Sequence, residues 1–374
     1  MELLNYINTH SDWETRLAAK PYCLDIKTEF PYTILKYRML ESDYSKSEVL
    51  QARGIIIRQD NAGQWFSVSY AMSKFFNATE PYACTKDIDW TTARVLEKVD
   101  GSLCKLAFDP IDQIWLFSTN GSIFGNAAMV NDTGMSFYDL FVKTIGGAAA
   151  YSSLLDMLDK NYTYFFELAT IYNKICVSYK EDGIYYLGRR DMRTLEEDGT
   201  MVEFPGLPIK YPRSFSLNSL AQCNAAAEAL GENVEGFVVC DNQFHRVKIK
   251  CPWYISMHRL RGNGPITPTH IISLWQEDAL DDFIAAFPEA VPLVEDIKKK
   301  LTDLIEKADI AYDCVKGHGP RREFALRAQS YVKPIASYLF ARLDEKTDCA
   351  STYFKQMKPR NLAELIDVKD IGIK

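Results

Sequence analysis

The spacing of hydrophobic residues changes near residue 260, and this change constrains the fold more than any other feature of the sequence. Before it, short apolar runs bounded by turn residues indicate β-strands, with one helical stretch at residues 217–230. The clearest runs cover residues 65–70, 114–117, 175–179, 183–187 and 234–239. We therefore predict an α+β fold, in which a domain of antiparallel sheets (residues 1–258) precedes an all-helical domain (residues 259–374).

Residues 261–268 break both patterns with glycine and proline, as an interdomain linker does. Beyond them the apolar residues fall on one helical face, namely Leu293, Ile297, Leu301, Leu304, Ile305 and Ala308. A second helix is predicted over residues 321–339, bent or broken near Pro334. The lysines at 298–300 are interpreted as a solvated helix face, with contact to RNA as the alternative.

The composition is that of a cytoplasmic protein with reduced thiols. The chain has 374 residues, lacks a long uninterrupted apolar run, and begins without a basic-then-apolar signal, so we expect neither secretion nor a membrane span. Its nine cysteines lack C-x-x-C spacing, which argues against zinc and a disulfide framework. With a net charge of −7, any nucleic-acid site must be a local basic groove.

The tetrad Lys98-Val-Asp100-Gly101 is the place to expect covalent chemistry. Strand-like sequence flanks it on both sides, so we expect Lys98 on the edge of a sheet, where backbone can approach a ligand. A buried amine that loses its proton can attack a nucleotide α-phosphate and form a lysyl phosphoramidate. The alternative is a β-turn with two solvated charges, because such a tetrad arises by chance in roughly one chain in ten of this length.

Two carboxylates and two lysines lie in or beside other apolar strands. Glu167 and Glu235 are costly to leave unpaired there, so each is expected to meet a metal, a ribose hydroxyl or a cation; a structural ion pair is equally compatible. Lys248 and Lys250 alternate along one strand and share a face. They could contact one phosphate and hold down the pKa of Lys98, or they could form a solvated strand face.

The aromatic residues near these segments divide between core and pocket. Of Phe75 and Phe76, we expect one in the core and the other in the wall of a nucleotide pocket. Trp253 and Tyr254 are expected to pack in the core rather than stack on a base.

Taken together, the segments occur in the order used by lysine-dependent nucleotidyltransferases. They are residues 52–57, 72–77, 97–103, 164–168, 173–175, 234–239 and 246–254. Over about residues 30–258 the sequence resembles the ATP-dependent RNA ligases typified by the first RNA ligase of T-even bacteriophages. The resemblance implies a nucleotidyltransferase (adenylation) domain, followed by a helical region that serves RNA recognition.

The resemblance also implies roles for individual residues. Lys98 would be the adenylated nucleophile, assisted in catalysis by Glu235 and by Lys248 and Lys250 at the α-phosphate. Arg53 and Lys74 would face the outgoing pyrophosphate. The nucleotide site would further include Tyr37, Phe76, Glu97, Gly101, Asn120 and Glu167, and the metal site would include Asp100, Glu167 and Glu235. Asn120 departs from the family pattern, because relatives place a basic residue there.

The implied reaction joins an RNA 5′-phosphate to an RNA 3′-hydroxyl in three steps, with ATP, a covalent AMP intermediate, and Mg²⁺ or Mn²⁺. The implied substrate is broken RNA such as a nicked tRNA, and we expect a monomer. One alternative is a DNA ligase or capping-type transferase with the same lysine, but those continue into a strand-rich barrel where this chain is helical. The other is an RNA-binding protein with a dead nucleotide site, suggested only by Asn120.

Overall fold

The computed structural model describes residues 1–130, 133–262, 266–317 and 320–369. The chain divides into two compact units, Met1–Ile255 and Ser256–Lys374. No described helix is both long and apolar enough to cross a membrane. Each unit has its own hydrophobic core, and each is described separately below.

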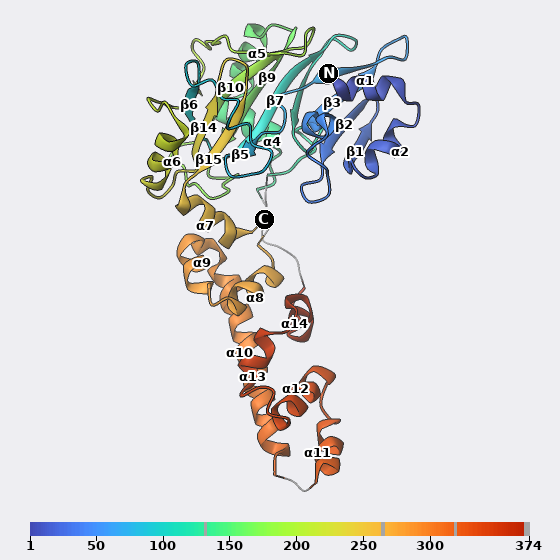
Figure 1. Cartoon of the computed structure of the whole chain (residues 1–374), viewed down its shortest axis with the longest axis vertical. Coiled ribbons are helices and arrows are strands. Elements are labelled where there is room, and N and C mark those ends of the chain that lie inside the picture. The colour runs from blue at the N-terminus through green and yellow to red at the C-terminus, as the bar shows by residue number, and fades with distance from the viewer. Residues whose placement is uncertain (131–132, 263–265, 318–319, 370–374) are drawn as a thin grey trace. The chain divides into compact units, whose positions relative to one another are not determined.

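The first unit begins with a four-stranded antiparallel sheet. Its strands lie in the order β1 (Leu24–Glu29), β2 (Tyr32–Tyr37), β3 (Arg53–Gln59) and β4 (Trp65–Ser69). Helices α1 (Glu2–Thr9), α2 (Trp13–Ala18) and α3 (Ser47–Gln51) pack beside this sheet (Figure 1). Leu3, Leu17, Leu35 and Ile55 are almost completely buried in the core between them.

Two further sheets of the first unit form the walls of the cavity described below. One has the order β11 (Glu197–Asp198), β10 (Gly183–Asp191), β9 (Tyr162–Ala169), β7 (Ser102–Asp109) and β8 (Ile114–Thr119), with β12 (Ile209–Lys210) beside β10. Helices α4 (Phe137–Ile145) and α5 (Ala148–Met157) pack against it. The other has the order β13 (Ser214–Phe215), β6 (Arg94–Glu97), β14 (Gly236–Cys240), β15 (Arg246–Lys250) and β5 (Phe76–Asn77), with α6 (Leu220–Glu228) packed on it.

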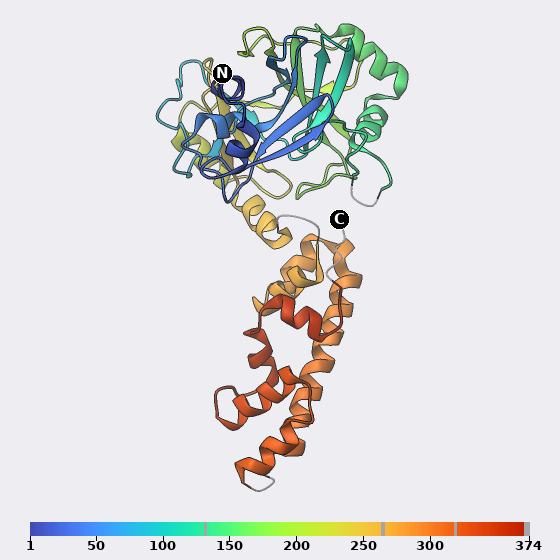
Figure 2. The same ribbon diagram turned by 90° about the vertical axis from the view of Figure 1, so that its right-hand side faces the viewer.

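The second unit is helical throughout its described residues. Its longest helix is α10 (Val291–Val315), which buries Val294, Ile297, Leu301, Leu304, Ala308, Ala311 and Val315 on one face. Helices α8 (Pro268–Gln276), α12 (Lys333–Leu343) and α13 (Ala350–Lys355) pack on α10, and Figure 2 shows the short helices beside it. The remaining elements are α9 (Leu280–Ala286), η1 (Pro288–Ala290), α11 (Arg321–Ala328) and α14 (Pro359–Leu365). Helix α7 (Pro252–Arg261) carries the chain from the first unit to the second.

The predicted α+β class, with sheets followed by helices, is confirmed. Two short pairings are parallel rather than antiparallel, β5 with β15 and β12 with β10. The helix expected over 321–339 is broken as predicted, because Pro334 stands in the first turn of α12, where its missing N–H is not needed. The strand expected at 175–179 is wrong: the segment is irregular, and Cys176 and Val177 direct their backbone N–H groups to a carboxylate instead of a neighbouring strand.

Candidate active site

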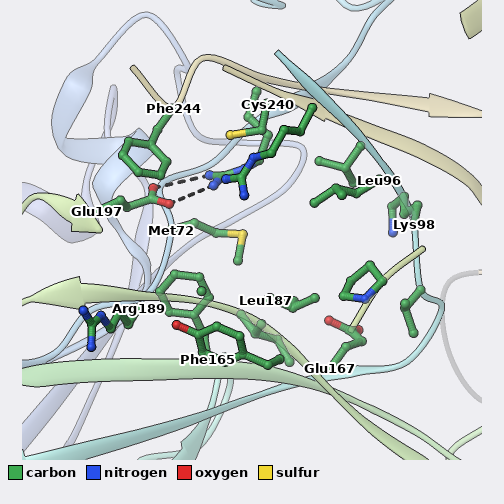
Figure 3. A pocket seen from close by; sticks show the side chains of 18 of the residues that line it. Met72, Leu96, Lys98, Phe165, Glu167, Leu187, Arg189, Glu197, Cys240 and Phe244 are labelled. Atoms are coloured by element: carbon green, nitrogen blue, oxygen red, sulfur yellow. Dashed lines mark hydrogen bonds and ion pairs between the residues drawn. The ribbon is translucent and has the colours of Figure 1, made fainter. Parts of the chain in front are cut away.

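A cavity of about 330 Å³ lies between the two large sheets of the first unit. Apolar side chains make up much of its wall, among them Leu96 and Val238 from one sheet and Phe165 and Leu187 from the other. Lys98 and Glu167 lie at one end, and Glu197 and Phe244 lie at the other (Figure 3). A mostly apolar cleft with a few charged groups is the usual form of a small-molecule site.

Lys98 directly follows β6 and lines one end of this cavity. Its backbone N–H donates to the Gly236 carbonyl oxygen at 2.8 Å, which fixes the turn onto β14. The expectation of an edge strand was wrong, since β6 lies between β13 and β14. The side chain is only 20% exposed, and its Nζ lies 2.6 Å from Glu235 Oε2. Lys98 is therefore held by a backbone hydrogen bond at its N–H group and by an ion pair at its Nζ.

The protonation of Lys98 differs from the sequence-based expectation. Burial disfavours its charged form, but the carboxylates of Glu235 and Glu167 outweigh burial, so the pKa of Lys98 is raised. The pKa of Lys248, in contrast, falls to about 7 because of its burial and the positive charges of Lys98 and Arg53. In this state the ammonium of Lys98 is stabilised, and a proton must leave before the amine can attack.

Lys248 and Lys250 both lie on β15, but their surroundings differ. Lys248 lines the cavity, with its Nζ 4.6 Å from the ring centroid of Phe75. Lys250 lies 3.3 Å from Glu235 Oε1 and 4.6 Å from the ring centroid of Tyr254, outside the residues that line the cavity. Glu235 itself is 2% exposed and bridges Lys98 to Lys250.

Glu167 on β9 is the second carboxylate near Lys98. Burial raises its pKa to about 8, with Glu235 adding to the shift and Lys98 opposing it. Two carboxylates that influence each other beside a cation suit a hard divalent ion such as Mg²⁺, which prefers oxygen ligands and often completes its shell with substrate phosphates. Glu167 and Glu235 are thus the residues that could hold a metal. Within the described part of the chain, no three His, Cys, Asp or Glu side chains form a metal-binding group of their own.

Glu167→Gln is expected to stabilise the folded protein near neutral pH. The unfolded chain releases the Glu167 proton near pH 4.5, whereas the folded protein keeps it to about pH 8. As pH rises between these values, Glu167 therefore lowers the free energy of unfolding by an increasing amount. We expect the gain from Glu167→Gln to be about 2 kcal/mol larger at pH 7.5 than at pH 5.5 in urea unfolding. Glu232→Gln, at an exposed position, serves as the control. An equal or smaller gain at pH 7.5 would contradict the assignment.

Asp100, the third predicted metal ligand, accepts hydrogen bonds from three protein groups. Its Oδ2 accepts the backbone N–H groups of Cys176 and Val177, both at 2.9 Å, and its Oδ1 accepts the Tyr254 hydroxyl at 2.8 Å. These three hydrogen bonds tie Asp100 to the irregular segment and to α7, and its role as a metal ligand stays a prediction. Gly101 is required for packing, since a Cβ there would collide with the Leu168 carbonyl oxygen.

The segment around Lys74 forms an aromatic cluster next to β5. The Nζ of Lys74 lies 5.1, 5.0 and 4.9 Å from the ring centroids of Tyr37, Tyr44 and Phe76. None of these four residues lines the cavity, whereas Phe75 does. The wall position expected for one of the two phenylalanines is thus held by Phe75, and Phe76 is buried at 6% exposure. Tyr37 and Lys74 lie beside the site, and Arg53 lies in its wall.

Asn120 lines the cavity next to Arg53 and Gly54 at the start of β3, where the pairing with β2 is irregular. Gly54 has a φ of +72°, and a Cβ there would lie 2.7 Å from Asn120 backbone atoms, so only glycine fits. Lys105 is fully buried and donates to the Gly54 carbonyl oxygen. Burial and the charge of Arg53 lower the pKa of Lys105 to about 7.

Glu97 also lines the cavity, and its carboxylate accepts a hydrogen bond from Arg213 at 2.9 Å.

Sequence reasoning assigned no role to five charged residues that line the cavity, namely Arg94, Arg189, Glu197, Asp198 and Arg246. Two of them, Arg246 and Glu197, form an ion pair. Arg246 stands two positions before Lys248 on the same strand face, so the alternation that identified the two lysines also marks Arg246. Glu197 comes from the two-residue strand β11, which no sequence pattern indicated. The two side chains meet at 2.8 Å.

A lysine flanked by carboxylates in a cavity between two sheets is the arrangement expected of the class of lysine-dependent nucleotidyltransferases. Residues 51–254, more than half of the chain, match the sequence profile of the family described as RNA ligase. The chain therefore belongs to the RNA ligase family, and the resemblance found in its sequence is confirmed.

Individual relatives agree with this family. The chain is 26% identical over 380 residues to the RNA ligase of Rhodothermus phage RM378, covering 83% of this chain and 84% of that protein. It is 29% identical over 286 residues to a protein of Autographa californica nuclear polyhedrosis virus named as a bifunctional polynucleotide kinase/RNA ligase. That match covers 72% of this chain but 39% of the viral protein. An archaeal ATP-dependent RNA ligase structure aligns with a TM-score of 0.45 and 13% identity, over 97% of this chain and 89% of that one.

Proposed function

We propose that this chain is an ATP-dependent RNA ligase that joins a 5′-phosphate to a 3′-hydroxyl through covalent AMP on Lys98. The observation that carries the proposal is the Lys98 amine, 2.6 Å from Glu235 at the mouth of the cavity lined by Glu167 and Lys248. Its substrate would be broken RNA, such as a nicked tRNA.

In the first step Lys98 Nζ gives up a proton and attacks the α-phosphorus of ATP. The bond between the α-phosphorus and the bridging oxygen breaks, and pyrophosphate leaves with the bonding electrons. Glu235 Oε2 already contacts Nζ, so it is positioned to take the proton. Lys248 and Arg53 face the cavity and would neutralise charge that develops on the transferring group, which is how phosphoryl transfer is mainly catalysed.

The next two steps reuse the same residues. The RNA 5′-phosphate displaces Lys98 from the AMP phosphorus, which restores the amine and leaves AMP on the RNA end. The RNA 3′-hydroxyl then attacks the 5′-phosphate and expels AMP, which closes the phosphodiester. A divalent ion such as Mg²⁺ or Mn²⁺, bound with Glu167 and Glu235, would supply further charge neutralisation.

Incubating the protein with α-labelled ATP and Mg²⁺, without nucleic acid, tests the proposal directly. Covalent label that survives denaturation and that acid releases, as from a phosphoramidate, is the expected result. Label from GTP but not from ATP would favour a capping-type transferase. The described residues of the second unit are helical rather than a barrel of strands, which supports the RNA-ligase branch over DNA ligases and capping enzymes.

We further propose that residues 1–258 carry adenylation and that residues 259–374 serve RNA recognition. Ending the chain after Arg261 is therefore expected to keep ATP labelling of Lys98, because all cavity residues precede that point. The truncated protein should lose any preference for a nicked, folded RNA over a short oligonucleotide, measured by competitive ligation. A folded truncation with an unchanged preference would contradict this division.

A further inference from the structure

The end of the cavity away from Lys98 is closed by an ion pair that joins the two sheets. Arg246 of β15 donates to Glu197 of β11, from Nη2 to Oε2 at 2.8 Å and from Nη1 to Oε1 at 3.3 Å (Figure 3). Arg190 donates to the same Oε1 at 3.0 Å. The Glu197 side chain is 7% exposed and lines the cavity. The carboxylate is thus fixed before any ligand arrives.

The distance of this pair from Lys98 along the strands matches the distance from the α-phosphate of a nucleotide to the edge of its base. Lys98 is level with Gly236, and Arg246 pairs with Cys240, four residues further along β14. Four strand residues span about 13 Å. The wall between these levels is apolar, formed by Leu96, Val238, Leu187 and Phe165. With the α-phosphate at Lys98, this stretch can hold a sugar and a flat base, and the edge of the base then faces Glu197.

The triphosphate is a poor occupant of this far end. Arg246 is already paired with Glu197, and its guanidinium lies against the rings of Phe75 and Phe244, at 5.4 and 5.9 Å from their centroids. Placing phosphate there would bring it against a buried carboxylate. Lys248 and Arg53 also line the cavity, and neither forms an ion pair with a carboxylate of the described residues.

Glu197 has capacity for one more hydrogen bond. A carboxylate offers about four acceptor positions, and donors from the described residues use three of those on Glu197. The remaining position is on Oε2, which receives only Arg246. The exocyclic amino group of adenine is a donor that can fill it. Guanine presents a carbonyl oxygen at the same position, which the carboxylate would repel.

Accepting the proposed ATP-dependent labelling of Lys98, we propose that the Glu197–Arg246 pair reads the base of the bound nucleotide and selects ATP over GTP. Glu197 accepts a hydrogen bond from the adenine amino group, and Arg246 together with Arg190 holds the carboxylate in place. Glu197 is a specificity-determining residue in this scheme, not part of the phosphoryl transfer.

The unmodified protein provides the first test. We would compare the rate of covalent labelling at limiting concentrations of ATP, GTP and purine riboside triphosphate, which lacks the amino group. Loss of one hydrogen bond to a charged acceptor should slow labelling at least about tenfold for the purine analogue. GTP should be slower still. Equal labelling by ATP and the purine analogue would overturn the inference, whereas no labelling by any nucleotide would overturn the proposed function itself.

The Glu197→Gln variant provides the second test, with Glu196→Gln as its matched control. Glu196 is the preceding residue, is exposed and does not line the cavity, so its variant makes the same charge change beside the tested position. Glu197→Gln should reduce the ratio of ATP to GTP labelling at least about tenfold, because the amide can donate to the guanine carbonyl. Glu196→Gln should leave that ratio unchanged. An equal change for all three nucleotides in Glu197→Gln would contradict base reading.

Discussion

Replacing Lys98 with alanine is expected to abolish covalent labelling by ATP and ligation of 5′-phosphorylated RNA. Among the described residues, the only amine then in contact with Glu235 would be Lys250, which does not line the cavity. Lys98→Arg should fail as well, because a guanidinium stays protonated and cannot attack phosphorus. Acid-labile label, detected after denaturing electrophoresis, is the measurement.

Two controls separate loss of chemistry from loss of fold. Lys86→Ala removes an exposed lysine of the same unit and should label normally. Lys98→Ala should keep the far-ultraviolet circular dichroism of the wild type and should still ligate RNA that already carries a 5′-adenylate, since that substrate enters after the step that needs the amine. Label retained in Lys98→Ala would show that another residue is the nucleophile.

Replacing Lys248 with alanine is expected to slow labelling by about 10²–10³-fold. Lys248 is the lysine of β15 that lines the cavity, and removing a preorganised cation from a transferring phosphoryl group has effects of this size. Single-turnover labelling with α-labelled ATP gives the rate. Lys248→Met, which keeps the length of the side chain, should be equally slow if charge rather than packing is responsible.

Lys250→Ala should also slow labelling, but by a different route. Lys250 holds Glu235 from the side opposite Lys98, so its loss frees the carboxylate that contacts the nucleophile. The defect should then appear in the pH dependence of labelling more than in the affinity for ATP. Near-normal rates in both the Lys248 and Lys250 variants would instead support a strand face with no part in catalysis.

The charged residues around Lys98 could be predicted from the sequence, because each of them stands in a regular strand or next to one. Lys98 directly follows β6, Glu167 lies within β9, Glu235 precedes β14 and Lys248 lies within β15. Alternation along a strand decides which face a residue occupies. The order of these segments along the chain then indicated the family, and the helical spacing after residue 260 indicated the second unit.

The sequence was insufficient where long-range packing decides the outcome. Phe75 and Phe76 are adjacent and equally apolar, and only the pairing of β5 with β15 determines which one faces the cavity. The segment at 175–179 has strand composition, but its N–H groups bond to Asp100, about 75 residues earlier in the chain. The pKa of Lys98 is raised by Glu235 and is not held down by the lysines of β15. The outcome depends on distances between side chains, which the sequence does not give.

The tetrad at 98–101 combines constraints of separate origin. Lys98 is suited to chemistry, whereas Asp100 ties down residues 176–177 and Tyr254, and Gly101 leaves room for the backbone of β9. A descendant that had lost ligation could therefore exchange its lysine freely and still be obliged to keep the aspartate and the glycine in order to fold. In such lineages the presence of the Asp-Gly pair would indicate only that the fold is kept, and the presence of the lysine would indicate that the activity is kept.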